Sequence, residues 1–199
     1  GLFVVLLAGI RWRIVITGFL ALLLASPAWY LFLAPEHIKS RILTVFNPYL
    51  DPTGAGYNII QSQIAIGSGG VYGKGYGNGA QSHLDFIPES NTDFILAVLA
   101  EEFGLLGILF LICLYLFILL RSSYIAYSAK DMFSRLLAGS ITLTFFMYVF
   151  VNMAMVSGLL PVIGLPLPLI SRGGTAIVTF FVCFGLLMSI QTHGQLKKS

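Results

Sequence analysis

Three carboxylates lie at or near the start of one long apolar run in the sequence. Asp93 follows a polar turn at 88–92, and Glu101 and Glu102 lie further along the apolar stretch 95–120. Placing an ionised carboxylate in hydrocarbon costs about 2.5–3.5 kcal/mol even on lenient insertion scales. A chain that keeps three acids here is therefore expected to use at least one of them. A carboxylate partly withdrawn from water at a membrane edge is suited to accept a proton from a reacting group.

The helix predicted to start at Asp93 carries its small and polar residues on one side, because three- and four-residue steps return to the same helical face. That side comprises Asp93, Ala97, Ala100, Glu101 and Gly104. Phe94, Leu96 and Phe103 are predicted to point elsewhere. We interpret the small, polar side as one that faces a protein-lined cavity, with Asp93 at its outer rim.

The composition is that of an integral membrane protein. The 199 residues are 57% hydrophobic and 10% charged, with a mean hydropathy of +0.90, whereas a soluble domain is about 45–50% apolar and about 25% charged. The net charge of +3 indicates no nucleic-acid partner, since membrane proteins carry cytoplasmic Lys and Arg for topology. Cys113 and Cys183 lie in predicted spans and are interpreted as packing residues. The absence of CxxC, HExxH and His clusters argues against a structural zinc site.

Hydropathy predicts an all-α membrane fold. Four complete spans are expected at 14–34, 93–120, 136–156 and 173–190. The apolar stretch 1–10 is too short to span, since a spanning helix needs about 20 residues. We interpret it as the end of a preceding span, so residues 1–199 are expected to be the C-terminal part of a larger polytopic domain.

Basic residues give the predicted orientation. They gather in the segments between or after spans that alternate to the same side, and these are Arg11, Arg13, Arg121, Lys130, Arg135, Lys197 and Lys198. The positive-inside rule assigns that side, and with it the C-terminus, to the cytoplasm. The long loop 35–92 and the turn 157–172 are therefore predicted to be exterior. The loop 35–92 carries four acidic residues against three basic ones.

The exterior loop is too apolar to be disordered. Apolar residues at helical spacing after Glu36 predict an amphipathic helix along the membrane surface, and 57–66 could form a short helix with Gln61 and Gln63 as its polar members. The glycine-rich run 67–79 does not match the Walker A spacing. Two interpretations stay open for it: a backbone that approaches a ligand closely, with Lys74 as a pyrophosphate partner, or a flexible surface loop.

The second exterior segment contains three helix-breaking prolines, Pro161, Pro166 and Pro168. Non-helical backbone at membrane depth is tolerated only where protein or a water-filled cavity surrounds it, which predicts a re-entrant turn at 157–172. For Arg172 we favour a side chain that reaches lipid headgroups over a role in the site.

Taken together, these residues resemble the C-terminal half of the SEDS family (shape, elongation, division and sporulation), in particular its members that act in cell elongation. The matching motifs extend over about residues 40–195 and are Asn47-Pro48 with Asp51-Pro52, Gly56-Tyr57, Gln61-Ser62, 65–70, 73–75, Pro88-Glu89, 92–94, 101–104 and 165–169. The family has Ser-Tyr-Gly-Gly where this chain has Ser171-Arg172-Gly173-Gly174. No role of that tyrosine is therefore carried over to Arg172.

The resemblance implies a peptidoglycan glycosyltransferase of the bacterial cytoplasmic membrane. Such an enzyme polymerises lipid II, an undecaprenyl-pyrophosphate-linked saccharide, into glycan strands at the outer face during cell elongation. The implied partners are a class B penicillin-binding protein, which is a transpeptidase, and other membrane proteins of the elongation complex. No cofactor is identified and no metal ligand is assigned, although a divalent cation such as Mg²⁺ can offset pyrophosphate charge.

The resemblance also suggests roles for individual residues. The family's essential aspartate corresponds to Asp93, which is the candidate catalytic base. The candidate substrate-binding residues are Lys74, Arg41, Glu89 and Gln61. Lys74 and Arg41 could offset the charge of the pyrophosphate. Structural or supporting roles are assigned to Glu101, Glu102 and Arg172, and the glutamates are expected to orient their helix by bonding to neighbouring spans.

Two other classes of function stay open at the level of sequence. A lipid II flippase would need a polar path toward the cytoplasm, and the spans 136–156 and 173–190 offer only uncharged polar residues: Ser140, Thr142, Thr144, Asn152, Thr175 and Thr179. A non-catalytic scaffold for a transpeptidase would leave Asp93 dispensable.

Overall fold

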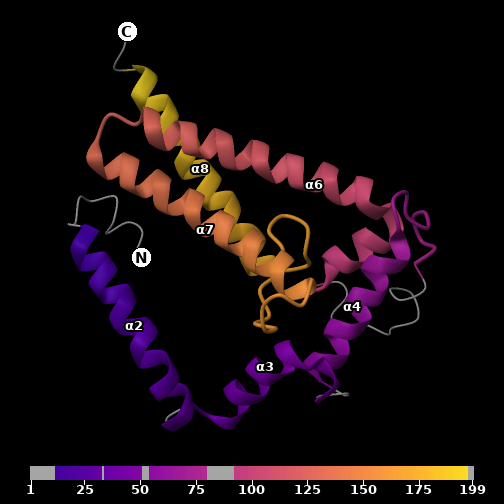
Figure 1. The fold of residues 1–199 in the computed structure, drawn as a ribbon. Helices are drawn as coiled ribbons and strands as arrows, with labels where there is room; N and C mark the ends of the chain where they lie inside the picture. Colours follow the sequence, from indigo (N-terminus) through magenta and orange to yellow (C-terminus); the bar gives the residue numbers. More distant parts are fainter. Residues whose placement is uncertain (1–11, 33, 51–53, 80–91, 197–199) are drawn as a thin grey trace.

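The computed structural model describes residues 12–32, 34–50, 54–79 and 92–196 (Figure 1). Every regular element in this part of the chain is a helix, which confirms the all-α prediction. The elements are α2 (Trp12–Phe32), α3 (Glu36–Phe46), the short 3₁₀ helix η1 (Pro48–Leu50), α4 (Ala55–Gly69), α6 (Ile95–Ser128), α7 (Met132–Val156) and α8 (Gly174–Leu196).

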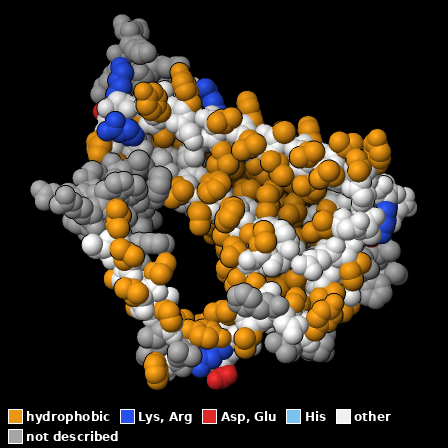
Figure 2. Space-filling model, viewed as in Figure 1, with side chains coloured by type: hydrophobic (Ala, Val, Ile, Leu, Met, Phe, Trp, Pro, Cys, Tyr) orange, Lys and Arg blue, Asp and Glu red, His pale blue; other side chains and the backbone are white. Residues whose placement is uncertain are grey.

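Three of these helices, α6, α7 and α8, are long and apolar enough to cross a membrane, so the chain is a membrane protein. The predicted span 14–34 overlaps α2, whose apolar stretch Ile16–Pro27 is shorter. A fourth span therefore stays a prediction, and the predicted end of a preceding span at 1–10 lies outside the described residues. In Figure 1, α2 stands apart from the other helices, and Figure 2 shows an open gap beside it.

The helices α6, α7 and α8 form a bundle around Phe145 of α7, which is 1% exposed. Its ring meets the edges or faces of three other rings, with centroid distances of 5.8 Å to Tyr115, 5.4 Å to Phe180 and 5.4 Å to Phe184. Tilted aromatic pairs at such distances add to the stabilisation from buried apolar area. This cluster fixes α7 and α8 against the middle of α6.

The described part of the stretch predicted as one long exterior loop, 35–92, contains two α-helices and the 3₁₀ helix η1. The amphipathic helix expected after Glu36 is α3, and the short helix expected at 57–66 is α4, which extends to Ala55 and Gly69. In Figure 1, α3 and α4 follow one another and bring the chain back beside the first turns of α6. The stretch therefore packs onto the bundle as folded helices.

Helix α6 is broken at Gly104, which has φ 65° and ψ −162°. A first part at 95–103 lies beside α4, and the remainder at 105–128 rises about 36 Å at about 1.5 Å per residue, enough for a hydrocarbon core of about 30 Å. The predicted span 93–120 is displaced relative to this helix. Arg121, expected in a basic loop, lies inside α6, and only residues 129–131 connect α6 to α7.

Candidate functional site

Asp93 lies in the turn before α6, two residues ahead of the first helical residue, and its side chain is half-buried. The next residue, Phe94, is fully buried in the bundle core and anchors this turn. A Cβ atom built on Gly164 would lie 3.2 Å from Asp93 Oδ2. The carboxylate therefore lies against residues 157–173, the irregular connection from α7 to α8, which we name the proline segment.

Two buried polar side chains join the Asp93 turn to the proline segment. On α7, Asn152 Nδ2 donates to the backbone oxygens of Asp93 (2.8 Å) and Leu165 (2.7 Å). Ser171 Oγ donates to the backbone oxygen of Thr92 (2.6 Å). Ser171 Oγ also accepts a hydrogen bond from the Leu167 N–H (2.7 Å).

Side chains from three other helices also hold the proline segment. Tyr115 of α6 donates to Pro168 O (2.7 Å), and Ser62 of α4 donates to Val156 O (2.9 Å), just before the segment. Arg41 of α3 donates from Nη1 to Val162 O (3.2 Å). In a helix each of these carbonyl groups would accept from the residue four positions later, and here a side chain from another helix donates to it instead. The segment is therefore tied to the bundle at several points.

The small, polar side of α6 packs against protein, which corrects the predicted cavity. Ala97, Ala100, Glu101 and Gly104 are buried, and a Cβ at Gly69 of α4 would overlap the Ala100 backbone oxygen. Two residues predicted to point elsewhere, Phe94 and Leu96, are also buried, whereas Phe103 is 43% exposed. The helix at 95–103 is enclosed on more sides than its sequence pattern suggested, because α4 and the bundle core cover it together.

The break at Gly104 is filled by residues 70–79, which we name the glycine segment. In a continuous helix the Glu101 and Glu102 carbonyls would accept hydrogen bonds from residues 105 and 106. Here they accept from the backbone N–H groups of Lys74 (3.0 Å) and Gly75 (2.9 Å). The glycine segment thus provides the donors that the broken helix lacks.

The donors released by the break are also satisfied. Leu105 N–H donates to Gly70 O (2.9 Å), and Leu106 N–H donates to Val71 O (3.2 Å). Unpaired backbone groups are costly inside a membrane protein. The break is stable because four backbone hydrogen bonds to the glycine segment replace the two helical bonds that join residues 101 and 102 to 105 and 106.

The glycines are needed because backbones approach each other closely here. A Cβ at Gly73 would overlap the Glu102 carbonyl, and a Cβ at Gly104 would overlap the Gly73 nitrogen. Gly73, Gly75 and Gly77 also adopt positive φ, which other residues rarely do. In the structure the backbone of this segment closely approaches the interior of α6, and its predicted approach to a ligand stays a prediction.

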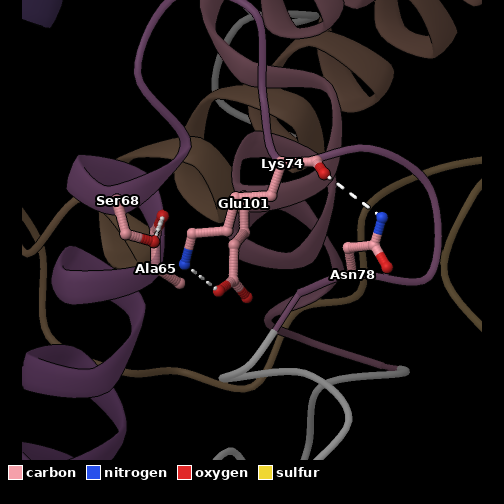
Figure 3. Close-up of polar contacts among 5 residues, drawn as sticks. All are labelled: Ala65, Ser68, Lys74, Asn78 and Glu101. Carbon is pink, nitrogen blue, oxygen red and sulfur yellow. Dashed lines mark hydrogen bonds and ion pairs between the residues drawn. The ribbon is translucent and has the colours of Figure 1, made fainter.

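Lys74 and Glu101 form an ion pair between the glycine segment and α6 (Figure 3). Lys74 Nζ lies 2.7 Å from Glu101 Oε1; the Glu101 side chain is fully buried, and the Lys74 side chain is 34% exposed. The neighbouring Glu102 accepts a hydrogen bond from the Gly77 N–H through Oε1 (3.1 Å). The two glutamates were expected to bond to neighbouring spans; these two contacts are instead with the glycine segment.

The candidate residues fall into two groups. Asp93 and Arg41 both lie against the proline segment. Lys74 and Glu101 lie at the far end of the helix 95–103. At a helical rise of about 1.5 Å per residue, Glu101 lies about 12 Å along the helix axis from Asp93.

The other candidates are more scattered. Gln61 is half-buried on α4, and Arg172 is exposed at the end of the proline segment. Glu89 lies outside the described residues. In the described ranges, no three His, Cys, Asp or Glu side chains come together as metal ligands.

Asn152 and Ser171 are site residues that sequence reasoning did not single out. Asn152 was noted only as a polar residue of an apolar span, and Ser171 only as part of a motif. The available signal was the position of one amide within an otherwise apolar helix end, since buried polar groups in membrane helices need partners.

Comparisons with known proteins cover nearly the whole chain. A family model for FtsW, RodA and SpoVE, described as "Cell cycle protein", matches residues 1–196. The peptidoglycan glycosyltransferase MrdB of Escherichia coli K12 is 50% identical over 198 residues, which are 98% of this chain and 53% of that protein. The peptidoglycan glycosyltransferase RodA of Treponema pallidum is 43% identical over 153 residues, covering 77% of this chain and 35% of that protein.

A solved structure described as "Structural coordination of polymerization and crosslinking by a peptidoglycan synthase complex" has a similar fold. Its TM-score is 0.76 at 28% sequence identity, with 96% of this chain and 52% of that chain covered. The chain thus spans about half the length of the curated relatives that it matches.

Proposed function

Because the chain belongs to the cell cycle protein family of FtsW, RodA and SpoVE, we propose that it forms half of a peptidoglycan glycosyltransferase. The proposed reaction is the polymerisation of lipid II into glycan strands during cell elongation. The observation that carries this proposal is the 50% identity with the glycosyltransferase MrdB over 98% of the chain. The proposed location is the bacterial cytoplasmic membrane, with the C-terminus in the cytoplasm, as the positive-inside rule suggests.

The proposed chemistry is a glycosyl transfer between two lipid-linked saccharides. An acceptor hydroxyl oxygen forms a bond to the anomeric carbon of the donor, and the bond from that carbon to the pyrophosphate oxygen breaks. The hydroxyl proton passes to the Asp93 carboxylate. The position of Asp93 in a turn, half-buried and against the proline segment, supports this role because the carboxylate is held in place without being fully enclosed.

The other candidate residues are assigned to substrate handling. Arg41 lies against the same proline segment as Asp93 and could offset the charge of the leaving pyrophosphate. Lys74 has the same proposed role, although its ammonium already pairs with Glu101. Gln61 and Glu89 complete the proposed set of substrate contacts. A class B penicillin-binding protein is the proposed partner, and the similarity to a component of a peptidoglycan synthase complex supports it.

The full-length protein with Asp93→Asn tests this proposal in a lipid II polymerisation assay. The amide is nearly the same size as the carboxylate but cannot take up the proton, so we expect loss of glycan polymerisation with folding intact. Asp131→Asn is the matched control, because Asp131 is exposed at the connection between α6 and α7. Near-normal polymerisation by Asp93→Asn would remove Asp93 from the base role.

The same variants separate an enzyme from a scaffold. If Asp93→Asn stops polymerisation yet still co-purifies with the transpeptidase partner, the catalytic proposal holds. If it polymerises normally but loses the partner, this part of the protein is a docking surface.

A further inference from the structure

Asn152 and Ser171 hold the two backbone carbonyl groups on either side of the Asp93 side chain. Ser171 holds the Thr92 carbonyl (2.6 Å), which belongs to the peptide group before Asp93. Asn152 holds the Asp93 carbonyl (2.8 Å), which belongs to the peptide group after it. Asn152 is 0% exposed and Ser171 is 2% exposed. Both donor side chains are therefore buried, while their acceptors belong to the half-buried residues 92 and 93.

Fixing two consecutive peptide groups fixes the residue between them. A peptide group is planar, so a residue has two soft backbone dihedrals, and these relate the planes before and after it. When both planes are held, φ and ψ of Asp93 are held, and so is the direction of its Cα–Cβ bond. The hydrogen bonds of Asn152 and Ser171 thus restrain the point and direction from which the Asp93 side chain extends.

The same two side chains also hold the wall that faces the carboxylate. Asn152 donates to Leu165 O (2.7 Å), and Ser171 accepts from the Leu167 N–H (2.7 Å). Leu165 directly follows Gly164, whose added Cβ would lie 3.2 Å from Asp93 Oδ2. Each side chain therefore links the Asp93 turn to the proline segment, and together they set the width of the space between them.

Packing alone does not explain an asparagine at position 152. Its neighbours Ala154, Met155 and Val156 are buried and apolar, and its own Oδ1 is buried with no hydrogen-bond partner in the described part of the chain. An apolar residue of similar size would avoid that unsatisfied oxygen. The advantage specific to the amide is its pair of donated bonds, one to the Asp93 turn and one to the proline segment.

We propose that Asn152 and Ser171 are positioning residues for glycan polymerisation, which hold Asp93 at a set direction and distance from the proline segment. This inference rests on the proposed function, because it takes Asp93 as the proton acceptor. A proton acceptor must lie within hydrogen-bond reach of the reacting hydroxyl. Small displacements of such a group reduce the rate strongly while leaving the binding of the rest of the substrate intact.

The test measures kcat and KM for lipid II polymerisation by the full-length protein. Asn152→Leu removes both donated bonds while keeping the same number and branching of side-chain heavy atoms, and Ser171→Ala removes a single oxygen. We expect each variant to lower kcat by about tenfold to a hundredfold and to leave KM within about twofold, because the interactions lost act on the chemical step. Ser171→Thr keeps the hydroxyl and is expected to restore most of the rate.

Ser62→Ala is the matched control. Ser62 is also fully buried and also holds a backbone oxygen next to the proline segment, that of Val156, but its hydrogen bonds do not reach the Asp93 turn. Its loss should lower thermal stability by an amount similar to that of Ser171→Ala and leave kcat unchanged. If Ser62→Ala lowers kcat as much as Ser171→Ala, the effect is a general loosening of the segment and the inference is overturned.

The outcomes separate this inference from the proposed function. Asp93→Asn is measured in parallel: if it is inactive while Asn152→Leu and Ser171→Ala keep the wild-type kcat, the positioning role fails and the proposed function stands. If Asp93→Asn stays active, the proposed base role fails first. Should Asn152→Leu not fold, Ser171→Ala with its Ser171→Thr rescue decides the test, since it changes the least. If Asn152→Leu and Ser171→Ala instead raise KM by about tenfold to a hundredfold and leave kcat unchanged, the positioning role is also contradicted.

Discussion

Gly164 of the proline segment lies close to the Asp93 carboxylate. An alanine Cβ at this position would lie 3.2 Å from Asp93 Oδ2, and Gly164 has φ +79°. A side chain at positive φ costs about 1–2 kcal/mol, and the new methyl group would press on the carboxylate. We expect Gly164→Ala to lower polymerisation at least tenfold, measured with lipid II and the full-length protein.

Gly174→Ala is the control for this residue-scale prediction. A Cβ at Gly174 would meet nothing within 4 Å, and the residue begins α8. Alanine favours a helix over glycine, so stability and activity should both be retained. Full activity in Gly164→Ala would mean that the Asp93 carboxylate does not need its present position against the proline segment.

At the scale of elements, the break in α6 depends on a partner far away in the sequence. The glycine segment supplies backbone partners to both sides of Gly104, and Lys74 adds the ion pair with the buried Glu101. Removing one member of a buried ion pair leaves an uncompensated charge, which costs about 3–5 kcal/mol. Because the Lys74 side chain is 34% exposed, we expect the loss of stability to lie toward the lower end of this range.

We therefore expect Lys74→Met to lower the Tm of the full-length protein clearly and the double variant Lys74→Met with Glu101→Gln to recover most of it. Thermal unfolding in detergent, followed by intrinsic fluorescence, measures both. Glu36→Gln serves as control, because Glu36 lies at the exposed start of α3. Equal Tm values for the single and double variants would show that the pair contributes little.

The kinetics of the double variant then separate two roles of Lys74. A lysine that only neutralises Glu101 becomes dispensable once Glu101 is uncharged, so the KM for lipid II should return to the wild-type value. A lysine that also contacts the pyrophosphate should leave KM raised by about tenfold to a hundredfold, the effect of losing a charge-assisted contact of about 1.5–3 kcal/mol.

At the scale of the whole molecule, the two ends of the bundle carry different residues. Arg121, Lys130 and Arg135 lie near the connection between α6 and α7, whereas the Asp93 turn and the two irregular segments lie toward the other end (Figure 1). The orientation proposed from basic residues places the first end in the cytoplasm.

We expect cysteines introduced at Asn78 and at Ser128 to react from opposite sides of the membrane, with position 78 labelled by an impermeant maleimide in intact cells. Both residues are exposed. The background is full-length protein with Cys113→Ala and Cys183→Ala, because both native cysteines are free. Labelling of position 128 without permeabilisation would overturn the orientation.

Local sequence was sufficient to predict that these helices and the irregular proline segment form, although not that α6 continues to Ser128. Long apolar runs determine where α6, α7 and α8 form, amphipathic spacing determines α3, and three prolines prevent a helix between α7 and α8. Asp93 could be singled out because a carboxylate beside a membrane helix is costly and because its motif is specific. These features depend on neighbours within a few residues, and such neighbours are visible in the chain itself.

The tertiary structure alone decided the break in α6 and the surroundings of Asp93. No proline lies within 95–128 to predict a break at Gly104, and the break is stable because residues 70–75, about thirty positions earlier, take up its backbone groups. Likewise, Asn152 and Ser171 gain their significance from carbonyls of residues 92 and 93 that they meet only in the folded chain. Hydrogen bonds between distant segments leave no periodicity in the sequence, because a glycine, an asparagine or a serine can serve many local purposes and its partner is chosen by packing.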